Sequence, residues 1–192
     1  MKPKLIAAGA LFGLAAYFWS SRHDDTGGES GGAVSEAVEY IGDLVETAGA
    51  EIMPYQLAIS RPRNAGYVEK ISQVEAANGI PAGLMLRLAW QECRFRADII
   101  DGRTVSSAGA AGMWQLMPIH WKTVDPLNWS AAADYAGGEL RRLYRVFGTW
   151  QLALAAYNWG EGNLKKYGIA RAPLETRNYY AQILGDIGVA IA

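Results

Sequence analysis

Glu92 is the residue whose type and position best fit acid–base chemistry. It comes near the end of the strongly apolar run LMLRLAWQE, where a predicted helix meets a glycine-rich loop. This position places a carboxyl group at the rim of the core, and partial desolvation raises the pKa of a carboxylic acid. Such a group can protonate a glycosidic oxygen at neutral pH, although most glutamates at helix ends are simply exposed.

Three later segments carry polar side chains that could share a cleft with Glu92. GAAGMWQLMP (109–118) has small residues that permit close backbone approach, followed by Gln115 and a helix start. AAYNWG (155–160) ends a predicted helix, and APLETRNYY (172–180) opens the last one. Each segment alone is a weak signal, because a Tyr-Asn pair usually marks a helix end and a glutamine usually lies on the surface.

Together the four segments resemble the family 1 lytic transglycosylases, whose soluble-lytic-transglycosylase-like domain is related to goose-type lysozyme. QECRFR looks like the family's E-S-x-F motif, and GAAGMWQLMP like G-A-x-G-L-M-Q-x-M-P. AAYNWG is similar to A-A-Y-N-A-G, and ETRNYY to E-T-R-x-Y-V. The order and spacing also agree, so the four motifs are highly specific together. The resemblance covers about residues 67–191 and leaves residues 1–60 outside.

The resemblance implies a role for each matching residue. Glu92 would be the sole catalytic acid/base, and Tyr179 would place its hydroxyl near the Glu92 carboxyl. Asn158 would contact an N-acetyl sugar, and the cleft would be lined by Gln115 and by the backbone around Met113. The implied substrate-binding residues are Cys93, Met113, Trp114, Gln115, Tyr157, Asn158 and Tyr179. No metal or other cofactor is implied.

The sequence departs from the family's pattern at three positions. Cys93 replaces the usual serine, which exchanges a good hydrogen-bonding hydroxyl for a weak thiol donor. Met113-Trp114 replaces Leu-Met, so we expect a large indole next to the cleft, and Trp159 replaces a small alanine. These changes bear on fine specificity and not on the reaction class.

The resemblance implies a lyase reaction on the glycan strands of peptidoglycan. Glu92 would protonate the β-1,4 linkage between N-acetylmuramic acid and N-acetylglucosamine, and the product would end in a 1,6-anhydro-muramoyl ring. Asp98 or Asp101 could instead serve as a second carboxylate, which would make the protein a hydrolytic muramidase (a lysozyme). A third reading, which Cys93 and Trp114 leave open, is a non-catalytic glycan-binding or structural module of an envelope-spanning complex.

Helical periodicity dominates the part of the chain that carries these motifs. The loop-like stretch 94–112 contains glycines, serines and short β-branched runs, which allow a small β-hairpin. The predicted class is therefore mainly α with at most that hairpin, and the family resemblance implies an α+β lysozyme-like fold. Helices are predicted over 67–77, 82–93, 130–147, 149–158 and 176–191, and a helical pattern is also present near Ile119.

The amino-terminal segment predicts contact with a membrane. Lys2 and Lys4 precede the uncharged run from Leu5 to Trp19, which is at the short end for a spanning helix. A cleaved signal peptide is disfavoured because Tyr-Phe-Trp occupies the place of the small residues at a cleavage site, and a buried helix is a third alternative. We expect residues 1–21 to be a transmembrane anchor or signal-anchor that contacts the membrane through residues 5–21.

Composition and patterning outline the remaining organisation. Residues 22–33 form a Gly/Ser-rich linker, residues 34–62 an amphipathic helix and connector, and residues 63–192 the lysozyme-like transglycosylase domain. The lysines favour an inside amino terminus, which would place the catalytic domain on the periplasmic, cell-wall side. An anchored enzyme of this kind would open the wall locally, either for phage genome entry from a virion or for a secretion or conjugation machine.

The charge balance and the scarcity of cysteine exclude other classes. The 192-residue chain has a formal net charge of −1, so a nucleic-acid partner is not expected. Cys93 is the only cysteine, so no internal disulfide can form. His23 and His120 lie far apart and no Cys/His cluster has metal-ligand spacing, so we expect no metal site.

Overall fold

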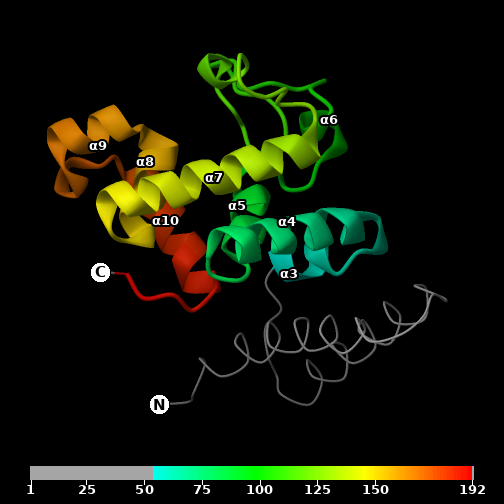
Figure 1. The fold of residues 1–192 in the computed structure, drawn as a ribbon, viewed down its shortest axis with the longest axis horizontal. Coiled ribbons are helices and arrows are strands. Elements are labelled where there is room, and N and C mark those ends of the chain that lie inside the picture. Colours follow the sequence, from blue (N-terminus) through cyan, green and yellow to red (C-terminus); the bar gives the residue numbers. More distant parts are fainter. Residues whose placement is uncertain (1–53, 192) are drawn as a thin grey trace. The chain divides into compact units, whose positions relative to one another are not determined.

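The computed structural model describes residues 54–191, and these are mainly helical (Figure 1). The chain divides into two compact units at the Gly66–Tyr67 boundary, and all four motifs belong to the second unit. Among the described residues, no helix has the length and apolar character needed to cross a membrane.

The predicted anchor (1–21), the predicted linker (22–33) and the part of the predicted amphipathic segment before Pro54 lie outside the described residues. They stay predictions. The described elements, in chain order, are α3 (Pro54–Ile59), η1 (Pro62–Asn64), α4 (Ala65–Asn78), α5 (Leu84–Cys93), α6 (Ala97–Ile100), η2 (Pro118–His120), α7 (Trp129–Phe147), α8 (Trp150–Trp159), α9 (Glu161–Tyr167), η3 (Ile169–Arg171) and α10 (Leu174–Asp186).

The prediction of a mainly helical chain is confirmed for the described residues. No strand forms between residues 54 and 191, so the hairpin allowed within 94–112 is absent, and an isolated antiparallel bridge joins Ala111 to Leu116. Two helices were not predicted from the sequence: α6, which lies inside the predicted loop, and α9. The predicted last helix is too long, because α10 ends at Asp186 and Gly188 then adopts a left-handed φ of 71°.

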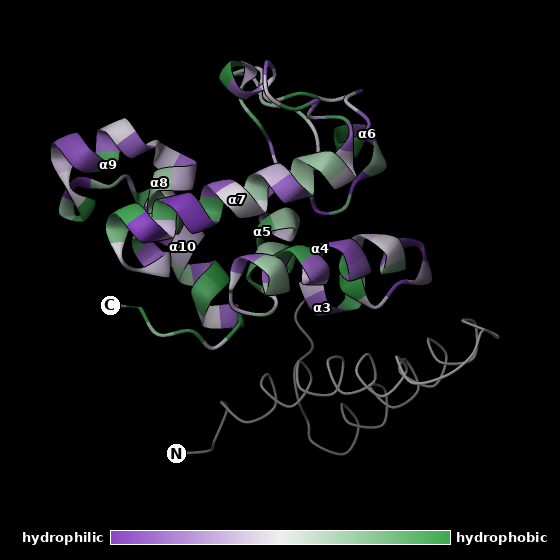
Figure 2. Ribbon diagram, in the orientation of Figure 1, coloured by the Kyte–Doolittle hydropathy of each residue, from purple (hydrophilic) through white to green (hydrophobic). Residues whose placement is uncertain are grey.

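Helix α8 lies at the centre of the carboxy-terminal part of the fold and packs against α7, α9 and α10. Its residues Ala153, Leu154 and Ala155 have no exposed surface, and the small side chains of the two alanines allow the neighbouring helices to approach closely. Figure 2 shows that α7 is amphipathic, with polar and apolar residues alternating along its length. Its buried face follows helical spacing: Ala132, Ala133, Ala136, Gly137, Leu140 and Leu143.

The amino-terminal end of α5 is held by a buried carboxylate from α4. The Glu75 carboxylate accepts hydrogen bonds from the backbone N–H groups of Gly83 (2.9 Å), Met85 (2.7 Å) and Leu86 (3.3 Å). These are donors that a helix start leaves without an intrahelical partner. Burial raises the pKa of Glu75 to about 7, against the opposing effect of the three hydrogen bonds. Glu75 therefore fixes the start of the helix that carries Glu92 near its other end.

Candidate active site

Helix α5 presents Glu92 just before an abrupt reversal of the chain. Arg94 and Phe95 follow with φ angles of 53° and 51°, in the left-handed region that non-glycine residues rarely adopt. Arg94 donates its backbone N–H to the Trp90 carbonyl at 3.1 Å, which caps the helix. Gln115, in the 109–118 motif, is the other non-glycine residue of positive φ in the described part. Backbone strain is therefore concentrated in two of the motifs, as is common at functional sites.

The Glu92 carboxyl lies in a half-buried environment between α5 and α10. The Tyr179 hydroxyl donates a hydrogen bond to Glu92 Oε1. Burial raises the pKa of Glu92 to about 7, the Tyr179 hydrogen bond opposes that rise, and the negative charge of Glu175 adds to it. A carboxyl whose pKa lies near neutral pH can both give and take a proton.

The 109–118 motif forms a loop that is pinned to two helices. Ala111 and Leu116 exchange backbone hydrogen bonds of 3.2 and 3.0 Å across its base. The Tyr157 hydroxyl, from α8, donates to the Trp114 carbonyl at 2.9 Å. The Trp114 indole N–H donates to the Trp129 carbonyl at the start of α7, at 3.4 Å. The loop backbone is therefore tied to α7 and α8.

The expectation that the Trp114 indole lies next to the cleft is wrong. The side chains of Trp114, Met113 and Cys93 have no exposed surface, so none of them presents a surface to a sugar. The indole fills the core beneath the loop, where its N–H has a carbonyl partner, and the Cys93 thiol bonds to the Ala89 carbonyl at 3.2 Å. Any contact that these three positions make with a glycan would use the backbone.

Tyr157 and Gln115 are half-buried, and Asn158 lies at the surface. Asn158 is exposed, and its Oδ1 accepts a hydrogen bond of 2.7 Å from the Thr176 hydroxyl on α10, which orients the amide and leaves its N–H donors for a ligand. The half-buried Gln115 donates its Nε2 to the Gly112 carbonyl at 3.0 Å. Burial raises the pKa of Tyr157 well above its ordinary value, and the negative charge of Glu92 contributes next. The role of each residue in catalysis or binding stays a prediction.

The two loop aspartates that could have served as a second carboxylate are engaged elsewhere. Asp98 pairs with Arg96 at 2.6 Å and accepts a hydrogen bond from Thr104, and these contacts keep its pKa low. Asp101 pairs with Arg103 at 2.9 Å, which likewise keeps its pKa low. Within residues 54–191, no group of three or more His, Cys, Asp or Glu side chains is placed to hold a metal.

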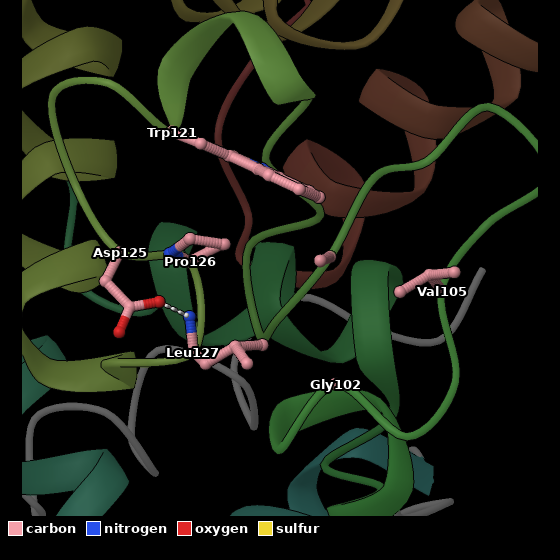
Figure 3. A pocket seen from close by; sticks show the side chains of 7 residues that line it. Gly102, Val105, Trp121, Asp125, Pro126 and Leu127 are labelled. Atoms are coloured by element: carbon pink, nitrogen blue, oxygen red, sulfur yellow. Dashed lines mark hydrogen bonds between the residues drawn. The ribbon is translucent and has the colours of Figure 1, made fainter.

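The loops also form an apolar pocket that the sequence did not reveal (Figure 3). Its volume is about 270 Å³, and it borders the 109–118 motif at Ala111. At its rim, Asp125 accepts the backbone N–H of Leu127 at 2.9 Å. The pocket does not include Glu92 or Tyr179. It is lined by Gly102, Val105, Ala111, Trp121, Asp125, Pro126 and Leu127.

Comparison with known families agrees with the motifs. Residues 69–180, more than half of the chain, match the family described as the transglycosylase SLT domain. The chain belongs to the transglycosylase SLT family. Members of this family are lytic transglycosylases, so the protein is an enzyme of the peptidoglycan lyase type and peptidoglycan is its substrate. The resemblance drawn from the four motifs is thereby confirmed. No solved structure matches the chain.

Proposed function

We propose that this SLT enzyme cleaves the β-1,4 bond between N-acetylmuramic acid and N-acetylglucosamine and leaves a 1,6-anhydro-muramoyl end. One observation carries the proposal: the half-buried carboxyl of Glu92 accepts a hydrogen bond from the Tyr179 hydroxyl and has its pKa raised to about 7. A carboxyl with a pKa near the working pH can act first as an acid and then as a base.

The reaction balances without water. Protonated Glu92 gives its proton to the glycosidic oxygen, and the bond from that oxygen to the muramoyl anomeric carbon breaks. The Glu92 carboxylate then takes the proton of the muramoyl 6-hydroxyl, whose oxygen forms the new bond to the anomeric carbon. Glu92 ends the cycle protonated again. The Tyr179 hydroxyl occupies Oε1, which leaves Oε2 to exchange protons with the substrate.

The ends of the released glycans test this proposal. We expect mass spectrometry of digested peptidoglycan to detect anhydro-muramoyl ends. Glu92→Gln should reduce their release at least about a hundredfold, because general acid–base groups contribute factors of that size or more. Glu69→Gln, on the exposed face of α4, is the matched control and should leave release unchanged.

The other possible products oppose the proposal in distinct ways. Reducing ends would indicate a hydrolytic muramidase, and Asp98→Asn and Asp101→Asn would then show whether either loop aspartate supplies the second carboxylate. Binding of glycan strands without cleavage would indicate a structural or glycan-binding module. Unchanged cleavage by the folded Glu92→Gln variant would remove Glu92 from the mechanism.

We propose further that residues 5–21 anchor the enzyme in a membrane, with the catalytic domain on the cell-wall side. The support is the uncharged run from Leu5 to Trp19 after two lysines. A local opening of the wall then suits phage genome entry from a virion, or a secretion or conjugation machine. Neighbouring capsid and tail genes, or a secretion operon, would separate these two settings.

Cell fractionation tests the anchor. The full chain should sediment with membranes and resist extraction by salt, whereas a chain without residues 5–21 should not. Replacing residues 22–33 by a Gly/Ser sequence of equal length is the control and should leave the distribution unchanged. Recovery of both chains in the same fraction would contradict the anchor.

A further inference from the structure

A buried arginine on α5 has no part in the mechanism described above. Arg87 lies within the apolar run that leads to Glu92, and its side chain is only 6% exposed. A charge buried in this way is costly unless it is paired and hydrogen-bonded. Its Nε donates to Asp186 Oδ2 at 2.6 Å, and its Nη1 donates to Gln91 Oε1 at 2.9 Å. Arg87 therefore binds both the partner helix and the residue just before Glu92.

The partner carboxylate lies at an unfavourable end of its own helix. Asp186 is the last residue of α10, where the helix dipole disfavours a negative charge. Asp186 therefore stabilises the fold through its contact with α5 and not through the stability of α10 itself. The helices α5 and α10 pack against each other (Figure 1).

The ion pair and the Glu92–Tyr179 hydrogen bond join the same two helices. Asp186 comes seven residues after Tyr179, about two helical turns, so both side chains lie on one face of α10. On α5 the order is reversed, since Arg87 precedes Glu92, and the helices therefore run antiparallel. Two contacts at separate points fix how far one helix can slide or turn relative to the other.

We propose that the Arg87–Asp186 ion pair is a positioning element of the active site, which fixes α10 against α5 and so keeps the Tyr179 hydroxyl on Glu92. The proposal rests on the proposed function only in giving that contact a catalytic purpose. Loss of the ion pair allows α10 to shift, and a hydrogen bond is lost with a shift of about 1 Å.

The effect on Glu92 has a definite sign. The Tyr179 hydrogen bond stabilises the carboxylate and lowers its pKa, so its loss raises that pKa further. The other groups that act electrostatically with Glu92 are Glu175 on α10, Tyr157 on α8 and the adjacent Cys93 on α5. Among the described residues, none of these three groups is hydrogen-bonded to Arg87. The positive charge of Arg87 acts on Tyr179 itself, where it opposes the rise of the Tyr179 pKa that burial causes.

The test compares two helix-bridging ion pairs. Arg87→Met with Asp186→Asn removes both charges together, so neither is left buried without its partner. Arg87→Lys is the conservative variant, which keeps the charge but loses the forked geometry of the guanidinium. The control is Lys70→Met with Asp134→Asn, since this ion pair of 2.8 Å bridges α4 and α7 and touches neither α5 nor α10.

The main readout is the titration of Glu92, followed by NMR of carbon-13-labelled carboxyl groups. We expect the pKa of Glu92 to rise by at least about half a unit in the chain without the Arg87–Asp186 pair, as in Tyr179→Phe. Arg87→Lys should give a smaller rise, and the control pair none. In a Tyr179→Phe background, removal of the pair should add nothing further, because the hydrogen bond is already absent.

Activity gives a second readout. The alkaline limb of the pH–rate profile should move to higher pH with the pKa of Glu92, and kcat should fall several-fold with little change in KM. The proposal would be overturned if the pKa of Glu92 were unchanged in the folded double variant. It would also be overturned if removing the ion pair raised that pKa equally in the wild-type and Tyr179→Phe backgrounds. If the double variant fails to fold, Arg87→Lys decides by the same titration. The titration needs no turnover, so a wild-type chain that releases no anhydro ends would refute the proposed function alone.

Discussion

At the scale of single residues, the site depends on a few hydrogen bonds from hydroxyl groups. Tyr179 acts on the Glu92 carboxyl directly, and Tyr157 acts on the backbone of the loop beside it. The Tyr157 hydroxyl reaches the carbonyl of Trp114, whose indole is itself tied to the start of α7. The conformation of the loop is thus determined by contacts that no single motif contains.

Removal of the Tyr157 hydroxyl should weaken both the fold and the site. In Tyr157→Phe the Trp114 carbonyl loses its donor, and we expect the free energy of unfolding to fall by about 1 kcal/mol in urea titrations. Turnover should fall further than this loss accounts for, since the loop borders the site. Tyr167→Phe is the control, because the exposed side chain of Tyr167 makes only ring contacts within residues 54–191, with Trp159 and Lys166. Equal effects of the two substitutions would contradict this account.

Some residues of the site could be predicted from the sequence and others could not. Glu92 could be predicted from the apolar run before it together with the later motifs, and Tyr179 could be predicted from its own motif. Trp114 was misjudged because its neighbours in sequence do not report that the space beneath the loop is closed. Arg87 and Asp186 lie far apart in the chain and belong to no motif, so only the packing of α10 on α5 brings them together.

At the scale of elements, the 109–118 loop requires a glycine at one position. Gly112 has a φ of 74°, and a Cβ there would clash with the Pro126 carbonyl oxygen. The prediction of close backbone approach in this motif is therefore confirmed at Gly112. The approach brings the turn at residues 125–127 against the motif and forms one side of the apolar pocket (Figure 3).

Gly112→Ala should destabilise the protein by at least about 2 kcal/mol, because the left-handed φ alone costs 1–2 kcal/mol for a residue with a Cβ. The clash with Pro126 adds to this cost, and cleavage should fall with it. Thermal unfolding measures the effect. Gly138→Ala in α7 is the control: a Cβ there meets nothing within 4 Å, so we expect a gain of about 0.5–1 kcal/mol. The account fails if Gly112→Ala matches the wild type.

The long helices were predictable and the short ones were not. Helix α7 has an apolar stripe with helical spacing over 19 residues, which the sequence displays clearly. Helices α6 and α9 have 4 and 7 residues, too few for periodicity to appear. They form because the surrounding chain holds them, with α9 set between Gly160 and Gly168, which both have positive φ.

At the scale of the whole molecule, two enclosed carboxyls determine how stability varies with pH. The pKa values of Glu75 and Glu92 are both raised from 4.5 to about 7, chiefly by burial. Between these two pH values the folded chain binds more protons than the unfolded chain, so stability falls as the pH rises. The effect of Glu161 is opposite, because ion pairs lower its pKa to about 2 and its contribution is lost on acidification below about 4.5.

We therefore expect the free energy of unfolding to be greatest near pH 4.5–5 and to fall by a few kcal/mol up to pH 7.5, since one pKa unit corresponds to about 1.4 kcal/mol. Urea titrations across this range measure the change. Glu92→Gln should remove roughly half of the dependence and leave the part due to Glu75. A stability that is flat or rises over this range would show that the two carboxyls are not protonated more readily in the folded chain.

The lone thiol next to Glu92 gives the molecule a built-in reporter. Cys93 is the only cysteine of the chain, it has no exposed surface, and burial raises its pKa to about 12. The folded enzyme thus keeps Cys93 as a thiol and shields it from oxidants and alkylating reagents. A reagent can label Cys93 only when α5 opens locally. The labelling rate therefore measures how often the helix that carries Glu92 opens.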